Sequence, residues 1–282
     1  MLIRFGYELT INCTHPSLMV CLLDAHPENA SKIRYETPFG AAPAVADELY
    51  VDSFGNSVRR FLAPACDLTI CRDAIIEDSG EPDVVRLDAE EVAAERLPNE
   101  TLIFTLGSRY CETDKLADIA WQLFGSAPRG WRRVQAICDF VCSHLTFGYQ
   151  HARNTRTAFE AYEERVGVCR DFSHLAVALC RCMNIPARYA NGFLGDIGVP
   201  PDPAPMDYNA WFEAFLDGGW FIFDARHNKP RIGRITVARG RDAADVALTT
   251  SFGPHALKSF KVWTDEVDSS LLSHLCRKSV PA

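Results

Sequence analysis

The sequence has no long apolar run, because none of its windows approaches the ~18 uncharged apolar residues that a membrane-crossing helix requires. The first residues, MLIRFGYELTINC, carry charges at Arg4 and Glu8 and lack the apolar block and cleavage site of a signal peptide. We therefore expect a cytoplasmic protein with no membrane contact. With 48% apolar and 23% charged residues among 282, the composition excludes a collagen-like or disordered chain.

Motifs that bind common cofactors and metals are also missing. The chain has no GxxxxGK[ST] phosphate loop, no dinucleotide fingerprint, no HExxH and no acidic calcium-binding loop. Its eleven cysteines include no CxxC pair. Cys180 and Cys182 would lie roughly 200° apart on a helix, which prevents them from sharing a metal ion. We expect no cofactor and no metal, and we interpret most of the cysteines as packing residues.

The net charge of −8 is concentrated in one segment, because residues 77–100 hold nine acids and only two bases. The remainder is nearly neutral, so the chain has no overall field that would attract nucleic acid, and we expect no nucleic-acid partner. We interpret the acidic segment as a solvated linker, with a partner-binding segment as the alternative. The stretch from Ala225 to Arg241 holds six bases and no acid. We interpret it as a strand with solvated basic positions, with a site for an anionic ligand or nucleic acid as the alternative.

The hydrophobic pattern changes along the chain. Residues 2–77 alternate as strands and turns, with a hairpin turn at Gly55-Asn56. Helical periodicity follows at 113–123, at 128–145 and from Cys169 onward, and strands return at ARYANGF, NAWFEAFL, GWFIFDA and RITVARG. We expect an α+β protein with an antiparallel β domain at 1–78, the acidic linker at 79–100 and a core at 101–282.

Cys169 in the segment GVCRDF is the candidate nucleophile. The cysteine falls where a helix begins, and the unpaired N–H groups there favour a thiolate and can bind an oxyanion. Asp171 is placed to cap the same turn. A buried structural cysteine at a helix start would give the same pattern.

A predicted hairpin supplies further candidate residues. Strand alternation places Asn209 and Trp211 on one face of the first strand, and the Gly218-Gly219 turn brings Asp224 to the same open end. A polar residue and an acid facing a helix-start thiol match the layout of a cysteine triad, in which a base and an orienting group serve the nucleophile.

These segments together resemble bacterial transglutaminase-like proteins of the cysteine-protease type, which share the papain-like core. The matching segments are RTAFEAYEERVGVCRDFSHLAVALCRCMNIPARYANGF, AWFEAF with GGWFIFDARHN, ARGRDAADV, and DSFGNSVRRF in the N-terminal part. The resemblance implies an N-terminal β domain before a catalytic core, with Cys169 as nucleophile and Asp224 as the orienting carboxylate. It implies a peptide or protein amide as substrate, cleaved by water or passed to another amine.

The chain departs from that pattern at one position, where Asn209 replaces the histidine that precedes Ala-Trp in the family. An amide cannot serve as a general base near neutral pH. We predict His227 as the replacement base if the strand ends near Ala225, with His151 as the next candidate, and we expect Asn209, Trp211 and Gln150 to line the substrate pocket. The alternatives are a catalytically silent binding module and an engineered substitution at position 209.

Overall fold

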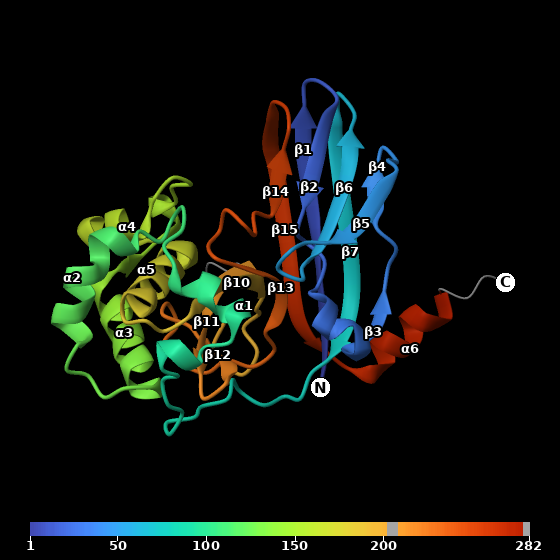
Figure 1. The fold of residues 1–282 in the computed structure, drawn as a ribbon. Coiled ribbons are helices and arrows are strands. Elements are labelled where there is room, and N and C mark those ends of the chain that lie inside the picture. The colour runs from blue at the N-terminus through green and yellow to red at the C-terminus, as the bar shows by residue number, and fades with distance from the viewer. Residues whose placement is uncertain (202–207, 279–282) are drawn as a thin grey trace.

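The computed structural model describes residues 1–201 and 208–278 and shows a β body beside a mixed core (Figure 1). The β body contains two antiparallel sheets, ordered β15-β1-β7-β3 with β4 also on β7, and β14-β2-β6-β5. Its strands are β1 (Leu2–Cys13), β2 (Ser17–Cys21), β3 (Ile33–Glu36), β4 (Gly40–Ala42), β5 (Asp47–Val51), β6 (Ser57–Ala63), β7 (Asp67–Glu77), β14 (Thr249–Ser251) and β15 (His255–Val267). The predicted N-terminal β region and the turn at Gly55, with φ +84°, are confirmed.

The last two strands of the chain belong to this β body. β15 pairs with β1 along its whole length, from Leu2 opposite Val267 to Cys13 opposite His255, and β14 pairs with β2. Helix α6 (Ser269–Lys278) follows β15. The expected division placed residues 1–78 in the β domain and residues 101–282 in the core. The sheets differ from it, because β15, the partner of β1, comes from the far end of the chain. Sequence periodicity marks a strand but does not say which distant strand it pairs with.

The core packs helices against one face of a four-stranded sheet. The helices are α1 (Asn99–Leu102), α2 (Thr113–Phe124), α3 (Trp131–His144), α4 (Ala158–Glu164) and α5 (Cys169–Cys182). The sheet is ordered β12-β11-β10-β13, with strands β10 (Ala187–Phe193), β11 (Tyr208–Leu216), β12 (Gly219–Phe223) and β13 (Ile235–Gly240). Helix α5 contacts β11, α2, α3 and α4, so it is the central element of the core. The α+β class and the three predicted helices are confirmed.

The acidic segment is exposed over much of its length but is anchored to the core at Ala89 and Glu91. Glu91 is 5% exposed at its side chain and binds the buried Arg133, and Ala89 lies inside the hydrophobic cluster of the core. The carbonyl of Ala89 accepts from Trp131 N–H, and a Cβ at Gly130 would lie 2.2 Å from that oxygen. The interpretation as a solvated linker is therefore wrong at Ala89 and Glu91, which pack against the core.

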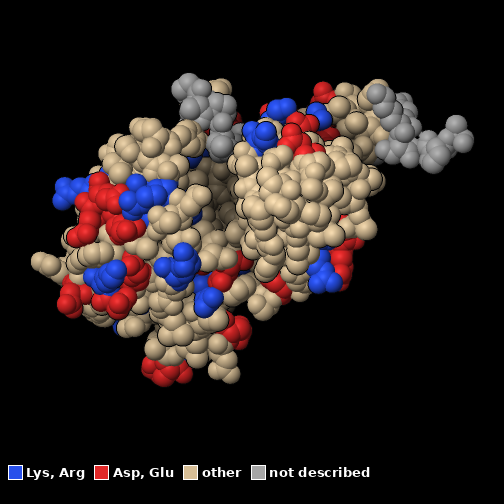
Figure 2. Space-filling model, turned by 90° about the horizontal axis from the view of Figure 1, so that it is seen from above, with Lys and Arg blue, Asp and Glu red and all other residues tan. Residues whose placement is uncertain are grey.

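Three arginines of the basic stretch are not solvated. The side chains of Arg231, Arg234 and Arg239 are buried and form ion pairs with Asp196, with Asp83 and Asp224, and with Glu28 and Glu213. An arginine inside a protein is stable only when its charge is paired. Seen from above, the surface of the core shows acids and bases side by side, and it is hollowed between the core and the β body (Figure 2).

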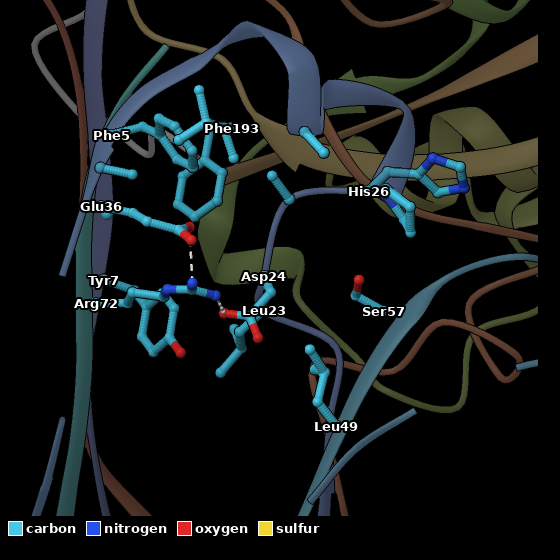
Figure 3. Close-up of a pocket in the computed structure, with 16 residues that line it drawn as sticks. Phe5, Tyr7, Leu23, Asp24, His26, Glu36, Leu49, Ser57, Arg72 and Phe193 are labelled. Atoms are coloured by element: carbon cyan, nitrogen blue, oxygen red, sulfur yellow. Dashed lines mark hydrogen bonds and ion pairs between the residues drawn. The ribbon is translucent and has the colours of Figure 1, made fainter. Parts of the chain in front are cut away.

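The two bodies share a hydrophobic cluster. Phe5 of β1 and Phe193 of β10 lie with ring centroids 5.1 Å apart, and both line a cavity of about 250 Å³ (Figure 3). Inside this cavity Arg72 forms ion pairs with Asp24 and Glu36, so the charged side chains that line the cavity are paired with one another. Cys169 packs against the same cluster, which places the candidate nucleophile where the core meets the β body.

Candidate active site

Cys169 is the first residue of α5, as the sequence predicted. The short parallel pair of β8 (Thr146–Phe147) and β9 (Val166–Gly167) leads into the helix. Val168 is extended, and its N–H donates to Asp171 Oδ2 over 2.9 Å, so the predicted cap by Asp171 is confirmed. Gly167 makes this possible, because a Cβ there would lie 2.6 Å from the Asp171 side chain.

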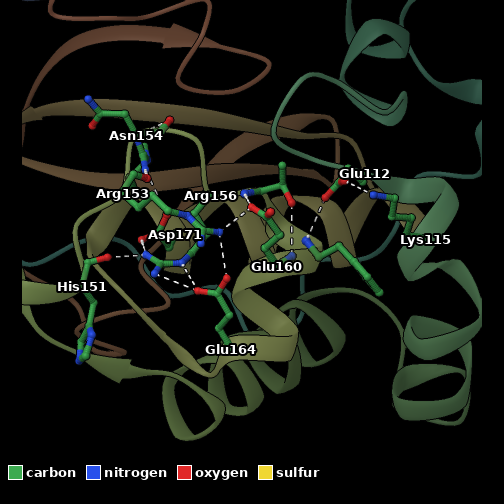
Figure 4. A network of polar contacts seen from close by, with 12 residues as sticks. Glu112, Lys115, His151, Arg153, Asn154, Arg156, Glu160, Glu164 and Asp171 are labelled. Carbon is green, nitrogen blue, oxygen red and sulfur yellow. Dashed lines mark hydrogen bonds and ion pairs between the residues drawn. The ribbon is translucent and has the colours of Figure 1, made fainter.

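Buried charges fix this helix start. Arg156 donates from Nη1 to Asp171 Oδ2 over 3.1 Å and to the carbonyl of His151, and it also pairs with Glu164 of α4 (Figure 4). The Arg156 and Asp171 side chains are only 5% and 0% exposed. The network connects the loop before α4 to the turn that carries Cys169, so the nucleophile is held by a rigid support.

Asp224 and His227 meet directly. Strand β12 ends at Phe223, and the backbone turns so that Asp224 Oδ1 accepts from the N–H groups of Arg226 and His227. His227 Nδ1 lies 2.8 Å from Asp224 Oδ2. Because an ionised carboxylate only accepts, Nδ1 carries the proton and Nε2 is left as the basic nitrogen. The early end of the strand is the condition under which the sequence predicted that His227 would turn back.

Arg234 completes the surroundings of Asp224. Its Nη2 donates to Asp224 Oδ2 over 2.8 Å, and its Nε donates to Asp83 Oδ2 over 2.8 Å. Burial alone would raise the pKa of Asp224, but the Arg234 charge and the His227 hydrogen bonds outweigh it and hold that pKa well below its usual range. Asp224 is therefore a fixed anion, able to orient an imidazole and stabilise its cation.

The three residues expected to line the pocket differ in exposure. Asn209 is 5% exposed, donates to the carbonyl of Leu194 and accepts from Arg226 Nη1 over 2.7 Å. Trp211 is completely buried, 5.0 Å below the Arg234 guanidinium, so its ring faces the interior rather than an open pocket. Gln150 is exposed in the turn Tyr149–His151, with its amide against His151 Nε2.

The environment of the Cys169 thiol differs from the sequence expectation. Burial raises the pKa of Cys169, and the Arg226 guanidinium and the N–H groups of Ala210 and Arg170 oppose that rise without cancelling it. The helix start was expected to lower this pKa, but loss of water around the sulfur is the larger effect. Among the described residues, no hydrogen bond joins the thiol to an imidazole.

Other histidines have different surroundings. His174 is fully buried in α5, accepts from the N–H of Ala243 and stacks on Tyr110 at 5.1 Å, which is a structural role. His151 lies in the loop beside Gln150. Sequence reasoning missed Arg226, Arg234 and Asp83, which surround the candidate site. The signal was present as a run of bases without acids, but it was interpreted as solvated surface.

The described residues include no group of three or more His, Cys, Asp or Glu side chains arranged to hold a metal ion. Within the same part of the chain, no helix combines the length and apolar character needed to cross a membrane.

Comparison with known proteins agrees with this architecture. Residues 118–225 match the family model of the transglutaminase-like superfamily, so the core is a transglutaminase-like domain. An uncharacterized protein of Mycobacterium leprae is 27% identical over 225 residues, covering 73% of this chain and 75% of that one. A crystal structure from Cytophaga hutchinsonii, named as a "Putative Cysteine Protease", has a TM-score of 0.82 and 28% identity over 95% of this chain and 91% of its own. The resemblance indicated by the sequence motifs is confirmed.

Proposed function

We propose that this protein is a cysteine-dependent hydrolase of peptide or protein amide bonds. The transglutaminase-like domain and the relative named as a cysteine protease support a peptidase or transglutaminase-like function in general terms. Within that range, we assign Cys169 as the nucleophile, His227 as the general base and Asp224 as the orienting carboxylate. Water is the proposed acyl acceptor, and transfer to an amine is the related alternative.

The bond between His227 Nδ1 and Asp224 Oδ2 carries this proposal. It joins the proposed base to the proposed orienting group, in a chain that has Asn209 at the position where the family usually has histidine. Catalytic hydrogen bonds are often long in a ligand-free enzyme and tighten when substrate binds, so a base next to the orienting acid can serve the thiol in the complex.

The proposed reaction runs in two stages. His227 Nε2 accepts the proton of the Cys169 thiol, and the sulfur attacks the amide carbonyl to form a C–S bond. The oxyanion forms beside the sulfur at the N-terminus of α5, and we assign the N–H of Arg170, which points at that sulfur, as its donor. The C–N bond then breaks, the amine takes the proton from His227, and water cleaves the thioester with the same imidazole as base.

A second function, a catalytically silent binding module, is favoured by two observations. Asn209 occupies the usual base position and binds Arg226, and the thiol has a raised pKa. Such a protein would keep the domain and bind a peptide without cleaving it.

The two functions are separated by incubating the protein with a peptide library and following cleavage by mass spectrometry. Hydrolysis by the wild type that is lost in both Cys169→Ala and His227→Ala supports the triad. Absence of cleavage, together with peptide binding that Cys169→Ala leaves intact, supports the silent module.

A further inference from the structure

The guanidinium of Arg226 contacts two strands that adjoin the start of α5, β11 through Asn209 and β8 through Phe147. On one side, Nη1 donates to Asn209 Oδ1 over 2.7 Å, and the next residue, Ala210, directs its N–H at the sulfur. On the other side, Cζ lies 3.8 Å from the centroid of the Phe147 ring, and Phe147 pairs with Gly167, two residues before the cysteine. A hydrogen bond and a cation–π contact therefore fix the cation beside the thiol.

The charges around the thiol are few. Arg226 favours the thiolate, Asp224 disfavours it, and the N–H groups of Ala210 and Arg170 add to the effect of Arg226. Tyr189 of β10 also interacts electrostatically with Cys169, but burial raises the pKa of its hydroxyl well above the usual value, so it stays neutral. Arg226 is thus the cation that opposes both burial and the Asp224 carboxylate.

We propose that Arg226, positioned by Asn209, is the permanent cation that stabilises the Cys169 thiolate in place of the imidazolium used by related enzymes. The inference rests on the proposed function in taking Cys169 as nucleophile. The proton released from the sulfur goes to His227 Nε2 or to water, and the thiolate stays in the field of the guanidinium.

The residue type at position 209 suits this arrangement. An amide oxygen accepts from Arg226 and carries no charge of its own, whereas a protonated histidine at this position would repel the guanidinium. An arginine also stays protonated throughout the working range of a protein. The Asn209–Arg226 pair therefore supplies the positive charge beside the thiol, and His227 is left to transfer protons.

The test measures the rate at which iodoacetamide alkylates Cys169 as a function of pH, with the site identified by peptide mass spectrometry. We expect Arg226→Gln to move the midpoint of this profile up by about one pH unit, so that alkylation at pH 8 slows about tenfold. Arg226→Lys keeps the charge and should restore most of the rate. The exposed Arg60, paired with Glu48 on the β body, provides the control Arg60→Gln, which should leave the profile unchanged.

Two further variants complete the test. Asn209→Ala removes the anchor but keeps the cation, and it should shift the midpoint in the same direction by a smaller amount, even if Arg226→Gln does not fold. His227→Ala should leave the midpoint near its wild-type position. A midpoint unmoved by both Arg226→Gln and Asn209→Ala, or moved more by His227→Ala, would overturn the inference. Alkylation of Cys169 is measured without any substrate turnover. The proposed function fails in a different experiment, if Cys169→Ala still cleaves peptides.

Discussion

The guanidinium of Arg234 donates to the carboxylate of Asp224 over 2.8 Å inside the protein, where both side chains are only 3% exposed. The same guanidinium holds Asp83, which belongs to the acidic segment. Asp224, which orients His227, is therefore linked through Arg234 to the acidic segment. Charge composition alone predicts that this segment is exposed to solvent.

Removing this cation should destabilise the protein strongly. Arg234→Met leaves the Asp83 and Asp224 carboxylates without the buried cation they share, and the expected loss is about 3–5 kcal/mol in the free energy of unfolding. Urea denaturation measures this loss. The control Arg60→Met breaks an exposed ion pair with Glu48 and should cost about 1 kcal/mol or less. Equal losses in the two variants would contradict the structural role given to Arg234.

Acid should weaken the contribution of Asp224. Its pKa in the folded protein lies well below the usual value of about 3.9, so its stabilisation is complete above that pH and is lost as the pH falls toward the folded value. We expect the difference in unfolding free energy between the wild type and Asp224→Asn to shrink between pH 6 and pH 3. A difference that stays constant over this range would show that the carboxylate is not held as an anion.

Limited proteolysis tests the pairing of the chain ends. The exposed stretch around Arg86, flanked by Val85 and Leu87 at 49% and 62% exposure, should be the first site cut by trypsin. Because β15 pairs with β1 along its whole length, the two fragments should stay together in size-exclusion chromatography under native conditions. Fragments that separate without denaturant would show that this pairing is weak.

Restoring the usual histidine distinguishes the two proposed functions. If His227 is the working base, Asn209→His should not increase amide hydrolysis, because the new side chain removes the acceptor of Arg226. If the protein is a silent module that lacks only its base, the same variant should gain activity by about 10²–10⁴-fold. Hydrolysis of a peptide amide, compared with the Cys169→Ala variant, separates the two outcomes.

The order of helices and strands along the core could be predicted, because the sequence patterns that mark them are local. The glycine before Cys169, the Gly-Gly turn before Asp224 and the apolar spacing of α5 each specify a turn or a helix within a few residues. The seven-residue helix α4 was missed, although Thr157 and Glu160 form the capping box that marks its start. In the sequence, this helix is marked only by the Thr157 and Glu160 pair of the capping box, because seven residues are too few for a long periodic pattern.

The electrostatic features could not be predicted because they depend on distant partners. A run of six bases is compatible with a solvated strand until the fold brings Asp83, Glu213 and Asp224 against it. The same limit applies to Cys169, where a helix start indicates a low pKa and only the packed structure shows how much water the sulfur loses.

The most direct measurement of the proposed triad is the turnover of p-nitrophenyl acetate, with the acyl-enzyme detected by mass spectrometry. The wild type should release nitrophenol repeatedly, Cys169→Ala should give no acyl-enzyme, and His227→Ala should accumulate an acetyl group on Cys169, because water then lacks its base. Turnover by Cys169→Ala at the wild-type rate, or deacylation by His227→Ala at the wild-type rate, would contradict the assignment of these two residues.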